Sequence, residues 1–137
     1  MSPARPTKSG NPKRSASAAK GAQPVAKSPY GYAWTDWLAR EDPEFARVRQ
    51  PLSALSTGEG KELSIRHREM VIIGILAFRG RQDGVVAHMR RAIEHGATKR
   101  ELLEAIQAAA IPGGGPTLSS GVQALMLLEK EGAFKKS

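Results

Sequence analysis

The sequence has 137 residues, a formal net charge of +8 and no cysteine. This length suits a single domain. The absence of cysteine excludes disulfide bonds, zinc–thiolate sites and cysteine nucleophiles. The longest strongly apolar run, residues 70–78, is too short to cross a bilayer, and no hydrophobic segment of a secretory signal follows the first basic residues. We therefore expect a cytoplasmic protein.

Most of the positive charge lies in residues 1–28. This stretch holds six Lys and Arg and no acidic residue, so the rest of the chain is close to neutral. Pro, Gly, Ser, Ala and Lys dominate it, and their side chains bury too little apolar surface to offset the entropy of ordering. The composition predicts a disordered basic tail, through which nucleic acid or another acidic partner could bind.

Residues 29–41 follow as an aromatic arm. Four of the seven aromatic residues of the chain fall in this arm, namely Tyr30, Tyr32, Trp34 and Trp37. Such a cluster predicts docking on an apolar surface, which is either the core of the same chain or a neighbouring subunit.

Helical signals cover residues 42–137, and no stretch alternates as a strand does. Asp42, which is followed by proline, predicts the start of a first helix. This helix is expected to end before Pro51 and to bury two apolar side chains, Phe45 and Val48. The sequence therefore predicts an all-α domain.

A second helix is expected over residues 65–78, with Ser64 as its cap. Its second half is apolar around the whole circumference, which predicts burial on all sides. The sequence GRQDG at residues 80–84 breaks this helix, and a third helix is expected over residues 85–95.

Two further helices are marked by their ends. Thr98 and Glu101 have the spacing of a capping box, which opens a fourth helix. The glycine-rich stretch IPGGGP at residues 111–116 ends it. A last helix follows, capped by Thr117 or Ser119.

Glu69 interrupts the apolar pattern of the second helix. Isoleucines lie one helical turn away, at positions 65, 72 and 73. A carboxylate among them is either desolvated or paired. It is therefore either a structural acid, held by Arg66 or a backbone amide, or a functional group with a shifted pKa.

His88 follows on the next helix, at the border of the expected buried face. It is either a satisfied core histidine or the partner of Glu69, because two antiparallel helices joined by a short turn can bring these residues to the same level. A carboxylate–imidazole pair suits proton transfer. The other histidines, His67 and His95, complete no metal-ligand spacing, so no metal site is expected.

Residues 63–128 resemble the carboxymuconolactone decarboxylase family and its relative, alkylhydroperoxidase D. The matching features, in chain order, are Arg68 with Glu69, His88 followed by Ala92, the run Gly96, Ala97 and Thr98 with Glu101, and the turn GGGP. The resemblance implies an alkylhydroperoxidase D-like helical bundle over residues 42–137. It also implies a homo-oligomer, either a trimer or a hexamer.

Redox members of this superfamily carry two cysteines in a CxxC motif between the glutamate and the histidine. Aligned on that pair, the two positions fall at Arg81 and Gly84 here. Thiol peroxidase activity is therefore disfavoured for this chain. The decarboxylase branch, which lacks the CxxC pair, is the closer relative.

The decarboxylase branch implies a lyase of aromatic compound catabolism that removes carbon dioxide from a small carboxylated lactone without a cofactor. His88 would carry the proton and Glu69 would be its partner. Arg66, Arg81 and Arg90 are the candidate anion contacts. The alternative is a noncatalytic oligomeric scaffold whose basic tail binds an acidic partner.

Overall fold

The computed structural model describes residues 24–25 and 27–135, and these fold into six helices without a strand. The helices are α1 (Ala33–Glu41), α2 (Pro43–Thr57), α3 (Ile65–Phe78), α4 (Gln82–Glu94), α5 (Lys99–Gly113) and α6 (Gly115–Lys130). The predicted all-α fold is confirmed. Most of the predicted tail lies outside the described residues.

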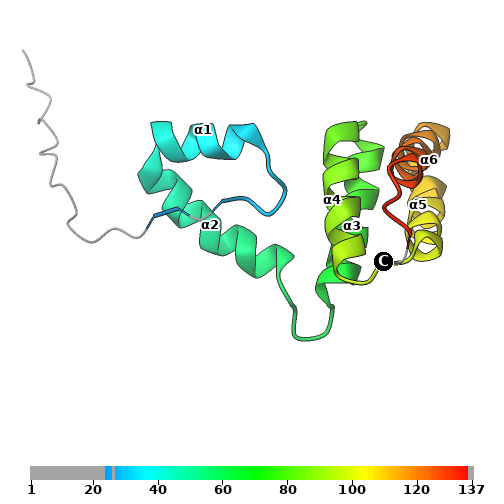
Figure 1. Cartoon of the computed structure of the whole chain (residues 1–137), viewed down its shortest axis with the longest axis horizontal. Coiled ribbons are helices and arrows are strands. Elements are labelled where there is room, and N and C mark those ends of the chain that lie inside the picture. The colour runs from blue at the N-terminus through cyan, green and yellow to red at the C-terminus, as the bar shows by residue number, and fades with distance from the viewer. Residues whose placement is uncertain (1–23, 26, 136–137) are drawn as a thin grey trace, which may run out of the picture.

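The helices form two parts (Figure 1). The first is a bundle of α3, α4, α5 and α6, in which α3 packs against each of the other three helices. The second is a hairpin of α1 and α2, which lies beside the bundle and meets α3 over a small contact. The core belongs to the bundle, and its fully buried members include Ile73, Val85, Met89, Leu102, Ile106 and Leu128. No helix in the described part of the chain is long and apolar enough to cross a membrane.

The start of α2 is as predicted, but its end is not. The side chain of Asp42 accepts a hydrogen bond from the backbone N–H of Phe45 (2.9 Å). The helix then continues through Pro51 to Thr57. Pro51 is exposed, and the hydrogen bond that a proline removes costs less where water can reach the backbone. The arm also contains a helix, α1, that the sequence did not predict.

The large apolar residues of α2 are exposed, which contradicts the predicted burial of Phe45 and Val48. Val48 is 74% exposed and Leu55 is 75% exposed. With Phe45 and Leu52 they recur at spacings of three and four residues, so they lie along one side of the helix. We call these four residues the α2 stripe.

The second half of α3 is likewise not buried on all sides. Ile73 and Ala77 face the core, but Val71, Ile75 and Phe78 are exposed. We call the three exposed residues the α3 face. The second half of α3 does carry apolar residues on all sides, but the other helices of this chain cover only some of them.

Arg68 attaches the end of α2 to α3. Its Nη1 donates to the backbone carbonyl oxygens of Leu55 (2.6 Å), Ser56 (3.1 Å) and Gly58 (3.2 Å). The last carbonyls of a helix have no partner within the helix, and a guanidinium there satisfies them and complements the helix dipole. Arg68 therefore fixes where α2 ends relative to the bundle.

The capping box of α5 is confirmed, and the predicted cap of α6 is wrong. Thr98 and Glu101 exchange both hydrogen bonds of the box. Only Gly114, with φ of +80°, separates α5 from α6. Thr117 lies inside α6, where its buried hydroxyl has no hydrogen-bond partner among the described residues.

Close packing between α5 and α6 generates a test of the fold. A methyl group at Gly121 would lie 2.4 Å from Cδ1 of the fully buried Ile106. We expect Gly121→Ala to lower the free energy of unfolding by about 1–3 kcal/mol through overpacking, as measured by urea denaturation. Gly115→Ala is the matched control in the same helix, because nothing lies within 4 Å of its added methyl group. Equal urea midpoints for the two variants would contradict this packing.

Candidate functional site

The structure brings Glu69 and His88 together. Glu69 lies on α3 with its side chain fully buried, and His88 lies on α4, the helix that packs beside it. The Nδ1 atom of His88 lies 2.6 Å from Oε2 of Glu69. The predicted pair is therefore in hydrogen-bond contact, while its catalytic role stays a prediction.

Two more donors hold the other oxygen of the carboxylate. The hydroxyl of Tyr30 donates to Oε1 of Glu69 (2.7 Å), and Nη1 of Arg91 donates to the same atom (2.6 Å). Burial raises the pKa of Glu69, but the hydrogen bonds from His88, Tyr30 and Arg91 outweigh it and hold this pKa below its ordinary value. Glu69 is therefore an ionised acceptor.

The charge on Glu69 determines the tautomer of His88. A carboxylate can only accept, so the proton between the two residues belongs to Nδ1 of His88. The remaining ring nitrogen, Nε2, has no hydrogen-bond partner within residues 24–25 and 27–135. Its lone pair is thus available to take up a proton.

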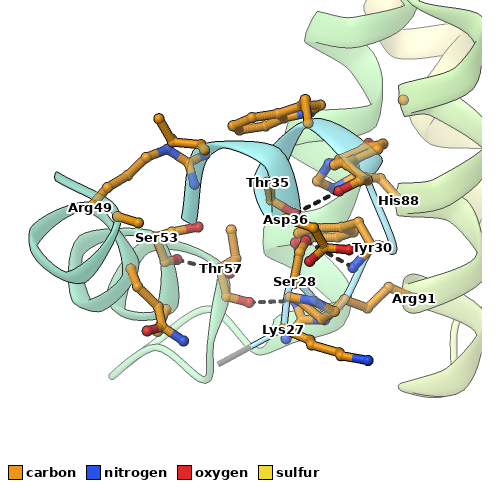
Figure 2. Close-up of a pocket in the computed structure, with 18 of the residues that line it drawn as sticks. Lys27, Ser28, Tyr30, Thr35, Asp36, Arg49, Ser53, Thr57, His88 and Arg91 are labelled. Atoms are coloured by element: carbon orange, nitrogen blue, oxygen red, sulfur yellow. Dashed lines mark hydrogen bonds between the residues drawn. The ribbon is translucent and has the colours of Figure 1, made fainter. Parts of the chain in front are cut away.

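His88 lines a cavity of about 680 Å³ between the arm, the helical hairpin and the bundle. Figure 2 shows Tyr30 from the arm beside His88 and Arg91, both of which come from α4. The side chains of the wall that are charged at neutral pH are four cations and one acid: Lys27, Arg49, Arg81, Arg91 and Asp36. The wall is therefore positively charged and suits an anionic ligand.

Only one of the three predicted anion contacts lies at this cavity. Arg81 is in its wall, with a side chain that is 58% exposed and that pairs with Asp83. The other two are directed elsewhere and do not line the cavity. Arg66 pairs with Glu101 (3.5 Å), and Arg90 pairs with Glu131.

Sequence reasoning missed Tyr30 and Arg91 as members of the site. Arg91 carried a usable signal, because it follows His88 by three residues and so lies next to it on α4. Tyr30 lies 39 residues before Glu69, outside both bundle helices, and no helical period connects them. Its position in the aromatic arm was the only indication.

No metal centre can be assigned to the site. Within the described ranges, no three His, Asp or Glu side chains gather as metal ligands would. His67 is hydrogen-bonded to Ser64, whose hydroxyl oxygen lies 2.9 Å from Nδ1 of His67.

The lowered pKa of Glu69 predicts a pH-dependent stability. A carboxyl group whose pKa is lower in the folded chain stabilises it fully above the ordinary value of 4.5, and this contribution is lost as the pH falls through the folded-state value. We expect Glu69→Gln to lower the free energy of unfolding by about 3 kcal/mol at neutral pH, because Arg91 and His88 lose a buried charged partner. The gap to the unsubstituted protein should narrow below pH 4.5.

Urea denaturation at a series of pH values measures this gap. Glu104→Gln is the control, since Glu104 forms an exposed pair with Arg100 and its loss should change stability little at any pH. A gap between Glu69→Gln and the unsubstituted protein that stays constant with pH would show that Glu69 is not held ionised by its partners.

Comparison with known proteins shows the family and the fold of the chain. Residues 43–126 match the model of the carboxymuconolactone decarboxylase family. A carboxymuconolactone decarboxylase family protein from Legionella pneumophila has a similar structure, with a TM-score of 0.64, 25% identity, and coverage of 71% of this chain and 86% of that one. A candidate carboxymuconolactone decarboxylase from Burkholderia xenovorans LB400 shares the fold, with a TM-score of 0.67, 24% identity, and coverage of 77% and 85%. No curated protein matches the chain. The chain belongs to the carboxymuconolactone decarboxylase family.

Proposed function

We propose that this protein is a cofactor-independent acid–base enzyme, similar to 4-carboxymuconolactone decarboxylase, that acts in the cytoplasm on a small carboxylated lactone. The observation that carries the proposal is the 2.6 Å contact between Nδ1 of His88 and Glu69, with His88 in the wall of the cavity. An imidazole oriented by a buried carboxylate is a proton carrier suited to neutral pH.

The proposed reaction needs one proton and no redox partner. Breaking the bond between the carboxylate and the ring releases carbon dioxide and leaves an electron pair on the ring. The conjugated lactone carbonyl accepts this pair as an enolate. His88, protonated on both nitrogens, then donates the Nε2 proton to carbon, and solvent returns a proton to the imidazole. Glu69 stabilises the imidazolium and holds the ring in place.

The charge of the cavity wall supports a carboxylated substrate. Of the three predicted contacts, Arg81 is the one that lines the cavity, and its exposed side chain pairs with Asp83, which is itself exposed. Arg91 is held by Glu69 and by the carbonyl oxygen of Thr57 (2.7 Å). Arg81 is therefore the proposed contact for the substrate carboxylate or the lactone oxygen.

The contacts of Glu69 favour an enzyme over the alternative of a noncatalytic scaffold. All three of its partners, His88, Tyr30 and Arg91, are side chains that line the cavity. In a purely structural site we expect a buried acid to be locked by backbone amides in a dry interior. The basic tail could still bind nucleic acid or another acidic partner in addition to catalysis.

We also propose that the protein is a homo-oligomer, either a trimer or a hexamer. The α2 stripe and the α3 face leave seven large apolar side chains in contact with water in the single chain. The hairpin contributes only Ala46 to the buried apolar residues, so it has almost no core of its own. A second copy that covers these surfaces would supply the missing burial.

Turnover by site variants tests the proposed enzyme. His88→Ala removes the proton carrier and should lower turnover roughly 10²–10⁴-fold on carboxylated lactones and β-keto acids. Glu69→Gln should also lower turnover, and the double variant should be little worse than the worse single one, because the two residues act as a unit. His95→Ala is the control, since His95 is exposed at the end of α4 and does not line the cavity.

Unimpaired turnover in both single variants would contradict the assignment of Glu69 and His88 as the proton-transfer pair. The absence of turnover by the unsubstituted protein across the substrate panel would favour the scaffold instead.

Light scattering tests the assembly. We expect a trimer or hexamer at micromolar concentration, and we expect Ile75→Asp on the α3 face to shift it toward monomer because an interface cannot bury the new charge unpaired. Gln107→Asp is the control, because Gln107 is an exposed polar residue of α5. A monomer for the unsubstituted protein would contradict the proposal.

A further inference from the structure

Tyr30 reaches the site from outside the bundle and makes two different contacts with the pair. Its hydroxyl donates to Oε1 of Glu69 (2.7 Å). Its ring packs on the imidazole of His88, with the ring centroids 3.9 Å apart and the planes inclined by 31°. One side chain therefore touches both members of the pair.

Because of the hydroxyl contact, each oxygen of the Glu69 carboxylate has its own hydrogen-bond partners. Oε2 of Glu69 faces His88, while Oε1 accepts from Tyr30 and Arg91. With both oxygens held, the carboxylate cannot turn away from the imidazole. The hydroxyl also draws negative charge toward Oε1, which tunes how strongly Oε2 attracts the proton on His88.

The tyrosine acts as a fixed donor in this arrangement. Burial, together with the hydrogen bond to Glu69, raises the pKa of Tyr30 to about 12. The phenol therefore keeps its proton throughout the neutral range and remains a hydrogen-bond donor to Glu69. Its contribution is to hold Glu69.

The ring contact shields the imidazole. His88 is 7% exposed, and the ring of Tyr30 covers one of its faces. This cover limits the access of water to the hydrogen bond between His88 and Glu69. It also restricts rotation of the imidazole, so Nδ1 stays on Glu69.

A turn in the arm directs Tyr30 to this place. The backbone N–H of Tyr30 donates to the side chain of Ser28 (3.2 Å), and that of Gly31 donates to the carbonyl of Ser28 (3.2 Å). Gly31 has a φ of +66°, a left-handed conformation that glycine adopts without strain. The arm is therefore shaped locally to present the tyrosine.

We propose that Tyr30 is a positioning residue of the Glu69–His88 pair, which is set for proton transfer only when the arm is docked with the hydroxyl on Glu69 and the ring on His88. The effect of Tyr30 on catalysis rests on the proposed acid–base function. The positioning itself is a structural property that can be measured without a substrate.

Proton NMR of the full-length chain tests the positioning directly. The Nδ1 proton of His88 should give a downfield resonance that exchanges slowly with water and that disappears in His88→Gln. Tyr30→Phe, which keeps the ring, should shift this resonance but preserve its slow exchange. Tyr30→Ala, which also removes the cover, should broaden or abolish it through exchange with water. Trp37→Phe is the control, since Trp37 is 57% exposed on α1 and does not line the cavity.

Circular dichroism shows that each variant is folded before its resonance is interpreted. A folded Tyr30→Ala variant whose resonance and exchange rate are unchanged would overturn the proposal. So would the lack of any resonance that depends on His88 in the unsubstituted protein. These outcomes do not depend on whether the protein turns over a lactone.

Kinetics separates the two proposals. If carboxylated lactones are turned over, Tyr30→Phe should lower kcat about tenfold, the effect of one lost hydrogen bond to a charged group, with KM little changed. Unchanged kcat in a folded Tyr30→Phe variant would overturn the role of Tyr30 and leave the proposed enzyme standing. No turnover by any form, combined with the expected NMR shifts, would overturn the enzyme and leave the positioning intact.

Discussion

The buried carboxylate of Glu69 is the constraint on which the arrangement of the site depends. An ionised group without contact to water must be matched by donors, or the chain would lose several kcal/mol of stability. The donors come from α4, through His88 and Arg91, and from the arm, through Tyr30. One buried charge is therefore contacted by side chains from α4 and from the arm.

Arginines attach the hairpin to the bundle at the same place. Arg68 and Arg91 both donate to carbonyl oxygens at the end of α2, and Arg91 also donates to Glu69. The end of α2 is thus held by polar contacts beside the site, while the α2 stripe points outward. This division explains how a helix with almost no core of its own can still have a defined position next to the cavity.

Much of the bundle follows from local sequence signals. The bounds of α3 and the capping box at Thr98 depend on residues within one or two helical turns, so local sequence patterns predicted them. Ser64 does begin α3, but its side chain makes no cap hydrogen bond and contacts His67 instead. The contact between Glu69 and His88 was also within reach, because a short turn joins their helices. Burial was predicted less well, because the same apolar pattern on α3 serves both the core and a surface that this chain leaves open.

The other wrong predictions concern a helix end, a helix cap and a site residue. In each of them, a local sequence rule was overruled by exposure, by a neighbouring residue or by the direction of a side chain. The rule that helices end before proline predicts an end at Pro51, but α2 continues because Pro51 is exposed and water can reach the backbone there. Thr117 has the residue type of a cap, yet Gly114 already provides the turn between α5 and α6. The choice of Arg90 over Arg91 depended on which side of α4 faces Glu69, and one position along a helix changes that direction by about 100°.

The position of Tyr30 has a consequence for how the boundaries of this domain are drawn. The segment that matches the family begins at residue 43, so it contains the acid and the imidazole but not the phenol that contacts them both. A fragment that begins at residue 43 would retain every helix of the bundle and the whole of the matched segment. Its buried carboxylate would nevertheless be one donor short, and one face of the imidazole would be open to solvent.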